Sequence, residues 1–380
     1  MEIPRWQIKD MHKIRCKKFA DVILCSYHSS KGVTPVAEKA MIAMSGGVDS
    51  SVAAYLTLQE GFDCVGATMH LIEKSSADIS DAQAVAARLG IPFCALDLSQ
   101  TFQCAVMEDF VSCYEAGLTP NPCIVCNKRL KFGALLDAAL EMGCQYIVTG
   151  HYAQIVKENG RFLLKKAVDA AKDQSYFLYS LSQHQLGHSR FPLGGKTKEE
   201  VRRIAQEQGF INARKKDSQD ICFIPGGDYF AFLREFTGKE YPCGNFLDMQ
   251  GNVVGTHQGA AAYTRGQRKG LGLAMGRPVY VSSKDMQKNT VTVCDDAQLY
   301  STSLLADNWN FMPFDTLTEP LHCKAKARSR MTEQPATVFP GENGICRVEF
   351  DEPQRALTVG QAVVLYDGDT VLGGGTITQV

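Results

Sequence analysis

The sequence lacks the features that mark several large classes of protein. Its 380 residues carry a formal net charge of −1, so no overall positive field attracts nucleic acid, and such a partner must be held by local patches. No apolar run approaches the length that spans a bilayer, so we expect no membrane partner. Internal repeats and low-complexity tracts are also missing from the sequence.

Cysteine, in contrast, is frequent, with 14 residues. Because no secretory signal accompanies them, we expect a reducing cytoplasm in which most thiols are small core residues and a few carry chemistry. At 380 residues, 45% of them hydrophobic, the chain is too long for one ordinary domain. We therefore predict a cytoplasmic protein of several domains.

The first part of the chain divides into an extension and an α/β domain. Residues 1–38 are basic near their start and show no clear periodicity, so we expect a poorly ordered extension. Over residues 39–225, strand patterns alternate with helical patterns, which predicts a parallel sheet with helices on both faces. The predicted strands span residues 40–44, 64–69, 93–97 and 145–149, and the predicted helices span residues 51–60, 80–89, 102–116 and 129–142.

After the α/β region, the chain becomes rich in glycine and in short strand patterns. A capping box formed by Thr197 and Glu200 predicts one more helix before the first domain ends. Glycine-rich turns and short strands over residues 226–298 indicate a small central domain. Over residues 299–380, short β-rich runs separated by Pro, Gly and Asp predict a β-barrel or a sandwich.

The loop after the first predicted strand, Ser-Gly-Gly-Val-Asp-Ser at 45–50, has the composition of a phosphate-binding turn. Its two glycines permit close approach of the backbone, so N–H groups at a helix N-terminus can face phosphate oxygens. Asp49 would repel phosphate unless it caps the helix or holds Mg²⁺. The alternative is an ordinary tight turn, and the P-loop and Rossmann glycine patterns are both missing.

A second stretch, Asn-Pro-Cys-Ile-Val-Cys-Asn-Lys at 121–128, combines a rigid turn with two thiols. Helical spacing beyond it makes Asn127 a candidate N-cap, which places Cys126 just outside a helix N-terminus beside Lys128 and Arg129. These surroundings should favour the thiolate. Two alternatives are an inert core thiol and half of a zinc site through Cys123 and Cys126, although no second close pair follows.

Taken together, five motifs resemble the bacterial tRNA-specific 2-thiouridylases, a family within the PP-loop ATP pyrophosphatases. The resemblance covers residues 39–380 in order and at family spacing. It implies an adenine-nucleotide-binding domain, a small central domain and a C-terminal β-barrel. The motifs are the loop at 45–50, Asn-Pro-x-x-x-Cys-Asn-Lys at 121–128, Gly-His-Tyr at 150–152, Lys-Asp-Gln-Ser-Tyr-Phe-Leu at 172–178 and Asp-Ile-Cys-Phe-Ile at 220–224.

The resemblance implies ATP-dependent adenylation of the wobble uridine at its C2 carbonyl oxygen, followed by sulfur transfer that gives 2-thiouridine, AMP and pyrophosphate. The persulfide carrier of the family falls on Cys222. Its nucleophilic partner, which can form a reversible disulfide with it, falls on Cys126. The implied partners are tRNAs such as those for Lys, Glu and Gln, and a sulfur-donor protein, either a cysteine desulfurase or a sulfur relay.

The family's binding residues can be carried over by position. Mg²⁺ is expected with ATP, with Asp49 as its candidate ligand. The ATP contacts fall on Ala43, Met44, Ser45, Gly46, Gly47, Val48, Asp49, Ser50, Met69 and Gly150. The tRNA contacts fall on Asn121, Pro122 and Cys123 for the target base, and on His151, Lys172, Asp173, Gln174, Arg328, Ser329 and Gln361 elsewhere.

Two positions depart from the family pattern. Many relatives carry Asp where this chain has Cys123, so the role of a general acid or base is unassigned there. Ser329 replaces an aromatic residue that could stack on a nucleotide. If Cys123, Cys126 and Cys222 converge, they could instead hold a [4Fe-4S] cluster whose open iron binds hydrosulfide, as an alternative to the persulfide.

One basic run supports an RNA partner without the resemblance. Its four cations occupy every second position, so a strand would place them on one face with Ala325 and Ala327 inward. The alternative is an edge strand guarded by lysines. The run consists of Lys324, Lys326, Arg328 and Arg330, and the clusters Arg265, Arg268, Lys269 and Arg214, Lys215, Lys216 add phosphate-binding capacity.

Two rival functions remain from the sequence alone. The first is an ATP-dependent C–N ligase of the same superfamily, but no amino-terminal glutaminase nucleophile is visible and Cys126 and Cys222 would be idle. The second is an RNA-binding protein with a degenerate nucleotide fold, which the intact loop at 45–50 argues against.

Overall fold

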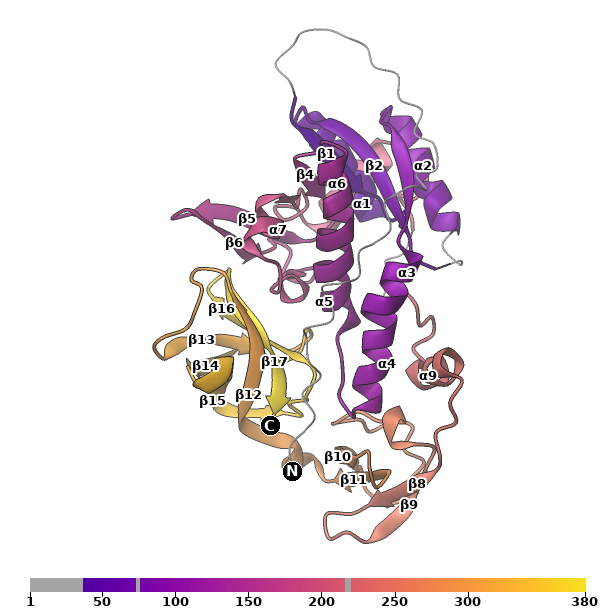
Figure 1. The fold of residues 1–380 in the computed structure, drawn as a ribbon, viewed down its shortest axis with the longest axis vertical. Coiled ribbons are helices and arrows are strands. Elements are labelled where there is room, and N and C mark those ends of the chain that lie inside the picture. The colour runs from indigo at the N-terminus through magenta and orange to yellow at the C-terminus, as the bar shows by residue number, and fades with distance from the viewer. Residues whose placement is uncertain (1–36, 73–75, 216–219) are drawn as a thin grey trace.

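The computed structural model describes residues 37–72, 76–215 and 220–380. The predicted extension over residues 1–38 therefore lies almost entirely outside the described residues, and so does Lys216. Figure 1 shows an α/β domain at the top, a β-barrel below it on one side, and a small central domain below it on the other.

The sheet of the first domain confirms the predicted parallel architecture. Its order is β3-β2-β1-β4-β7, and each neighbouring pair is parallel. The central strand carries Ala40, Met41 and Ile42, which are fully buried because helices cover both faces. The strands are β1 (Lys39–Ala43), β2 (Asp63–His70), β3 (Phe93–Asp97), β4 (Tyr146–Val148) and β7 (Ser189–Arg190).

Three helices pack around the first turn after β1. They are α1 (Val48–Gln59), α2 (Ser76–Leu89) and α8 (Lys198–Glu207). The predicted capping box opens α8, because the Thr197 hydroxyl accepts from the Glu200 N–H at 3.2 Å and the Glu200 carboxylate accepts from the Thr197 N–H at 2.7 Å. This cap fixes where α8 begins, opposite α1.

Two long helical runs extend from the sheet toward the other domains (Figure 1). One consists of α3 (Ser99–Phe102), η3 (Gln103–Met107) and α4 (Glu108–Glu115); the other consists of α5 (Pro122–Cys126), η4 (Asn127–Ala134) and α6 (Leu135–Glu141). The middle segments η3 and η4 are π-helical, with hydrogen bonds from residue i to i+5.

The second run corrects one prediction. It begins at Pro122 rather than near residue 129, because Asn121 is the N-cap and proline is pre-organised for the first helical position. Asn127 is therefore not an N-cap, and Cys126 lies inside the helical run instead of before it.

A hairpin links the first domain to the barrel. It consists of β5 (Ala153–Glu158) and β6 (Arg161–Lys166), and Lys165 of β6 pairs with Thr370 of the last barrel strand. The Lys166 N–H also donates to the Asp369 carbonyl at 2.8 Å. The chain then continues through η5 (Ser175–Phe177) and α7 (Gln183–Gly187).

The central domain holds a small sheet of order β10-β11-β8-β9. Its apolar core is continuous with α4, since Phe110 of that helix packs edge-on against Phe223, which in turn contacts Phe232. The elements are α9 (Tyr229–Thr237), β8 (Gly244–Leu247), β9 (Val253–His257), η6 (Ala260–Ala262), β10 (Tyr280–Asp285), β11 (Thr290–Cys294) and η7 (Asp296–Leu299).

The C-terminal domain is a barrel rather than a sandwich. Its strands run in the order β12-β15-β14-β13-β16-β17, and β12 pairs with β17 to close the circle. The elements are β12 (Tyr300–Phe311), β13 (Leu321–Lys326), β14 (Gln334–Phe339), η8 (Glu342–Gly344), β15 (Cys346–Arg355), β16 (Ala362–Asp367) and β17 (Thr370–Gln379).

The basic run is only partly a strand. Ala325 and Ala327 are fully buried, as predicted, but β13 ends at Lys326, so Arg328 and Arg330 do not continue its alternation. The edge-strand alternative is wrong, because β13 pairs with β14 on one side and β16 on the other.

Candidate active site

The loop after β1 is held in shape by its own serines. The Ser45 N–H donates to the Ser50 hydroxyl at 3.1 Å, and that hydroxyl donates to the Gly47 carbonyl at 3.1 Å. Gly46 has a φ of +71°, and a Cβ there would overlap the backbone carbonyl oxygen of Asp78. The turn therefore requires glycine and presents the first N–H groups of α1, which have no partner within a helix.

Asp49 neither caps a helix nor stands alone. Its two carboxylate oxygens accept from the Lys198 ammonium at 2.8 and 2.9 Å, and one of them also accepts from the Tyr152 hydroxyl at 2.9 Å. Lys198 is only 9% exposed. The ion pair places a cation beside the loop and removes the repulsion that Asp49 would exert on phosphate.

Sequence analysis missed both Lys198 and Tyr152. The capping box located the start of α8, but no local pattern shows that this start faces α1 across 149 residues of sequence. The Gly-His-Tyr motif did contain Tyr152, although without a role.

The other side of the loop is closed by Asn212 and Lys215. The Asn212 amide donates to the Gly46 carbonyl at 3.0 Å, and Lys215 donates to Asp78 and Asp81, each at 2.8 Å. Lys215 was predicted to bind phosphate together with Arg214 and Lys216. In the structure its ammonium is paired with two carboxylates, as that of Lys198 is with Asp49, so phosphate binding by Lys215 stays a prediction.

Gly150 joins the loop to the rest of the site. A Cβ at Gly150 would lie 2.8 Å from both the Asp49 carbonyl carbon and the Ser50 nitrogen, so the backbone after β4 packs directly on the first turn of α1. The next residue, His151, belongs to the second half of the site. Met69, the other predicted ATP contact outside the loop, lies near the end of β2 and packs partly buried against the core.

The three predicted thiols share one region. Cys123 lies in the first turn of α5 and is exposed, Cys126 lies at the end of α5 and is 9% exposed, and Cys222 is exposed in the segment before Phe223. Desolvation, followed by the proximity of Cys126 and Cys123, raises the pKa of Cys222 to about 11. The three thiols are therefore close enough to influence one another electrostatically.

The predicted low pKa of Cys126 is wrong. Burial raises the pKa of this thiol, because Cys126 lies within the helical run and not at its positive N-terminus. The positive charge of Lys131 partly offsets that effect at all three thiols. In an α-helix, residues five apart lie about 140° apart around the axis, whereas the wider π-helical turn of η4 brings Lys131 toward the side of Cys126.

His151 holds Lys131 in place. Its ring is 7% exposed, and burial followed by the charge of Lys131 lowers the pKa of His151 well below its ordinary value, so the ring is neutral. Nε2 lies 3.5 Å from the Lys131 ammonium and Nδ1 lies 2.7 Å from the Thr149 hydroxyl. Because an ammonium can only donate, Nε2 is the acceptor and Nδ1 carries the ring proton.

Several predicted tRNA contacts are engaged within the protein. Asp173 accepts from the Ser175 hydroxyl at 2.7 Å, and Gln174 accepts from the Tyr152 N–H at 2.9 Å, so both brace the turn beside Tyr152. The Arg328 guanidinium donates at 2.6 Å to the Ala356 carbonyl and to the Thr358 hydroxyl. Arg328 is therefore folded into the barrel instead of lining a basic face with Lys324, which is exposed.

Nothing in the described residues supports an iron–sulfur cluster. In residues 37–72, 76–215 and 220–380, no group of three or more His, Cys, Asp or Glu side chains is arranged to hold a metal ion. The same part of the chain contains no helix that is both long enough and apolar enough to cross a membrane.

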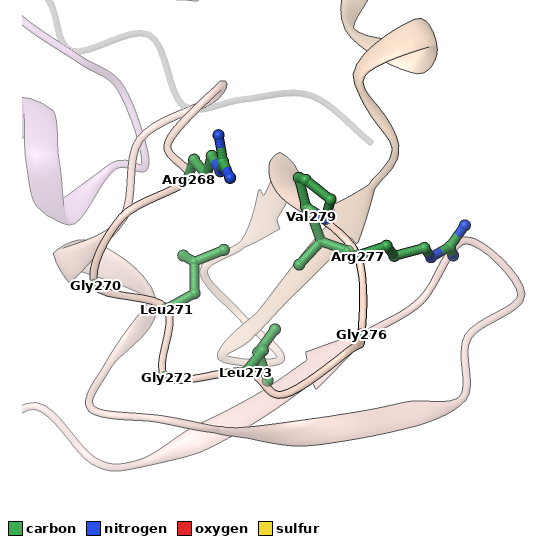
Figure 2. Close-up of a pocket in the computed structure, with 9 residues that line it drawn as sticks. Arg268, Gly270, Leu271, Gly272, Leu273, Gly276, Arg277 and Val279 are labelled. Carbon is green, nitrogen blue, oxygen red and sulfur yellow. The ribbon is translucent and has the colours of Figure 1, made fainter.

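A separate cavity of about 430 Å³ lies in the central domain (Figure 2). Leu271, Leu273 and Val279 line it beside Arg268, whereas Arg277 extends away from it and pairs with Asp295 at 2.7 Å. Of the predicted cluster of Arg265, Arg268 and Lys269, Arg268 faces this cavity and Arg265 donates to the Ser282 carbonyl at 3.3 Å.

Comparisons with known families cover nearly the whole chain. The tRNA methyl transferase HUP domain matches residues 38–226, the tRNA methyl transferase PRC-barrel domain matches residues 231–295, and the aminomethyltransferase β-barrel domain matches residues 301–377.

Individual relatives match over similar lengths. A tRNA-specific 2-thiouridylase MnmA from Acetivibrio thermocellus is 47% identical over 90% of this chain and 99% of its own. The protein of the same name from Symbiobacterium thermophilum is 46% identical over 92% of this chain and 94% of its own. A solved 4-thiouridine synthetase in complex with RNA and ATP has a TM-score of 0.35 and 18% identity, over 52% of this chain and 50% of that chain.

Proposed function

The chain belongs to the tRNA-specific 2-thiouridylase family, and from that premise we propose that it uses ATP to replace the C2 oxygen of the tRNA wobble uridine with sulfur. One observation carries the proposal: two consecutive residues, Gly150 and His151, connect the loop over residues 45–50, called the nucleotide loop below, to the region of the thiols. Gly150 packs on the first turn of α1, and His151 contacts Lys131. Lys131 lies in the helical run over residues 122–141 that carries Cys123 and Cys126, called the thiol helix below. These contacts support the proposal that one site serves both ATP and the thiols.

The nucleotide loop serves the first half of the reaction. A uracil carbonyl is a poor electrophile without a leaving group, so its oxygen attacks the α-phosphorus of ATP and pyrophosphate departs. The first N–H groups of α1 hold the phosphates, and Lys198 supplies positive charge beside them, with its position fixed by Asp49. The Asn121, Pro122 and Cys123 segment presents the base. Asp49 would be the residue that holds Mg²⁺ where the ion accompanies ATP, and the ion would offset the negative charge of the phosphates.

The thiols serve the second half. The terminal sulfur of a Cys222 persulfide attacks C2 and AMP leaves, which joins C2 to Cys222 through a disulfide. The Cys126 thiolate then attacks the Cys222 sulfur, which releases the thiolated base and leaves a Cys126–Cys222 disulfide. An external dithiol reduces that disulfide before the next cycle. Because burial raises the pKa of Cys126, the charge of Lys131 is needed to form its thiolate.

The persulfide must come from outside this site. A cysteine desulfurase or a sulfur relay of the cytoplasm supplies it in this proposal, and tRNAs such as those for Lys, Glu and Gln are the substrates. The proposed steps use no iron–sulfur cluster, because no group of three side chains among the described residues is arranged to hold a metal ion.

The test measures both halves of the reaction in one assay. Protein is incubated with ATP, a cysteine desulfurase and its cysteine substrate as the persulfide source, a dithiol reductant and unmodified tRNA whose wobble base is uridine, and the same tRNA with a wobble cytidine is the control. We expect pyrophosphate, AMP and 2-thiouridine only with the uridine tRNA. Pyrophosphate release that ignores tRNA but depends on an added amine would favour the C–N ligase instead, and tRNA binding without pyrophosphate release would favour a plain RNA-binding protein.

A further inference from the structure

A turn of the barrel, residues 358–361, contacts the loop that leads into the thiol helix. The Thr119 N–H donates to the Val359 carbonyl at 3.0 Å. The Gln361 side-chain amide donates to the Thr119 carbonyl at 2.8 Å and to the Pro120 carbonyl at 3.3 Å. One barrel turn thus bonds the backbone of two consecutive residues in the first domain.

The contact is too close for a side chain between the two backbones. Gly360 has a φ of +90°, and a Cβ there would lie 2.9 Å from the Thr119 nitrogen and 3.0 Å from the Leu118 Cβ. Both the backbone angle and the missing space require glycine at this position. The turn and the loop therefore have little freedom to slide past each other.

The barrel turn is itself anchored on both sides. The Gly360 N–H donates to the Ile377 carbonyl at 2.8 Å, and the Thr358 hydroxyl accepts from Arg328 at 2.6 Å. Arg328 also donates to the Arg265 carbonyl of the central domain at 3.2 Å. Arg328 thus links the central domain to the barrel turn, and that turn bonds the first domain at Thr119.

The next residues along the chain are those that the reaction needs. Asn121 caps α5, Cys123 lies in its first turn and Cys126 closes it. Because a helix is rigid, a rotation of the loop at its N-terminus displaces every thiol on it. The resemblance assigned Gln361 to tRNA, but its amide nitrogen is committed to two carbonyls of this loop.

We propose that Gln361 is a positioning residue, and that the turn over residues 358–361 sets the orientation of the base-holding loop and the thiol helix. The proposal rests on the function given above and deepens it. It implies that a shift of the barrel relative to the first domain reorients the thiol helix through this turn, because Gln361 bonds the backbone of the loop before it.

The first test separates positioning from RNA binding. Gln361→Met keeps the length of the side chain and removes the amide, and Gln334→Met is the control, because the Gln334 amide donates within the barrel to the Thr332 carbonyl. We expect Gln361→Met to lower kcat for thiolation about tenfold, with the Kd for tRNA changed by less than about twofold. An unchanged kcat with a weakened Kd would make Gln361 an RNA contact and overturn the proposal.

The second test does not depend on activity. Hydrogen exchange of the Thr119 amide reports directly on its bond to Val359, so Gln361→Met should accelerate this exchange about tenfold, whereas Gln334→Met should not. Unchanged exchange would overturn the proposal. If exchange accelerates while wild-type protein fails to thiolate tRNA, the positioning contact stands and the proposed function fails.

Discussion

The nucleotide loop and the thiol helix lie on opposite sides of residues 149–151, and they are held in different ways. The loop is enclosed by one domain, through bonds from Ser50, Lys198 and Asn212. The thiol helix contacts His151 of its own domain through Lys131, and Gln361 of the barrel bonds the loop before it. Cys222 is anchored through Phe223, which packs on Phe110 of the first domain and on Phe232 of the central domain.

This difference predicts how adenylation and sulfur transfer should respond to substitutions. A loop that is complete within one domain keeps its geometry when the barrel or central domain shifts. A thiol site assembled from three domains does not, because each domain supplies a separate constraint. Adenylation and sulfur transfer should therefore be separable by substitution; two experiments test that separation, and a third measures the stability of the packing between the first and central domains.

The largest effect is expected at Cys222. In Cys222→Ser the persulfide cannot form, so 2-thiouridine formation should fall by at least about a hundredfold. Transfer of label from α-phosphate-labelled ATP to tRNA should persist, because the nucleotide loop is untouched. Cys243→Ser, which alters another exposed thiol in the central domain, is the matched control. If Cys222→Ser still yields 2-thiouridine at the wild-type rate, another cysteine carries the sulfur.

The second effect is expected at Asp49. Asp49→Asn removes the carboxylate that fixes Lys198 at 2.8 and 2.9 Å, so pyrophosphate release should fall about a hundredfold. The Kd for tRNA should remain unchanged, because this pair lies at the loop.

The control for Asp49 is Asp315→Asn, which breaks an exposed ion pair with Arg161 at 2.9 Å. A double variant of Asp49→Asn and Lys198→Met should lose no more than the stronger single variant, since the two side chains act as one unit. Additive losses would show that Asp49 and Lys198 act independently.

The smallest effect is expected at Lys284, whose burial where the central domain packs on α4 lowers the stability of the fold. In the described part of the chain, the Lys284 ammonium has no hydrogen-bond partner, and it lies 5.9 Å from the centre of the Tyr114 ring at the end of α4. Burial lowers the pKa of Lys284 to about 8. Lys284→Met should therefore raise the free energy of unfolding at pH 7 by about 1–3 kcal/mol.

The stability gained by Lys284→Met should depend on pH. Between about pH 8 and the ordinary lysine pKa, the unfolded chain holds a proton that the folded chain has lost, so wild-type stability rises with pH in that interval. The advantage of Lys284→Met should thus be largest below pH 8 and fade as the pH rises. Denaturant unfolding from pH 7 to 10 measures it, with the exposed Lys269→Met as control. An advantage that does not vary with pH would contradict the assignment.

The difference between local contacts and contacts of distant segments explains which features could be predicted from the sequence. The turn over residues 45–50 was predictable because Ser45, Gly47 and Ser50 bond one another within a few residues. The parallel sheet and the barrel were predictable because the strand and helix patterns are periodic. Lys198 was missed, since its role depends on the packing of α8 against α1.

Errors arose where the tertiary structure overrides a local pattern. The pKa of Cys126 was predicted in the wrong direction because Pro122 starts the helix earlier than the apolar spacing suggested. Lys131 was missed because a π-helical turn changes which side chains share a face. Arg328 fits an alternating strand in sequence, yet the strand ends at Lys326 and the guanidinium satisfies barrel carbonyls instead.

The hairpin that joins the first domain to the barrel also constrains the order of folding. Lys165 pairs with Thr370, a partner that lies 205 residues later in the chain (370 − 165). During synthesis, β6 therefore emerges long before its neighbour exists and exposes an unpaired strand edge. Such edges invite pairing with other chains. Completion of the last barrel strand, β17, therefore covers this edge of β6 at Lys165.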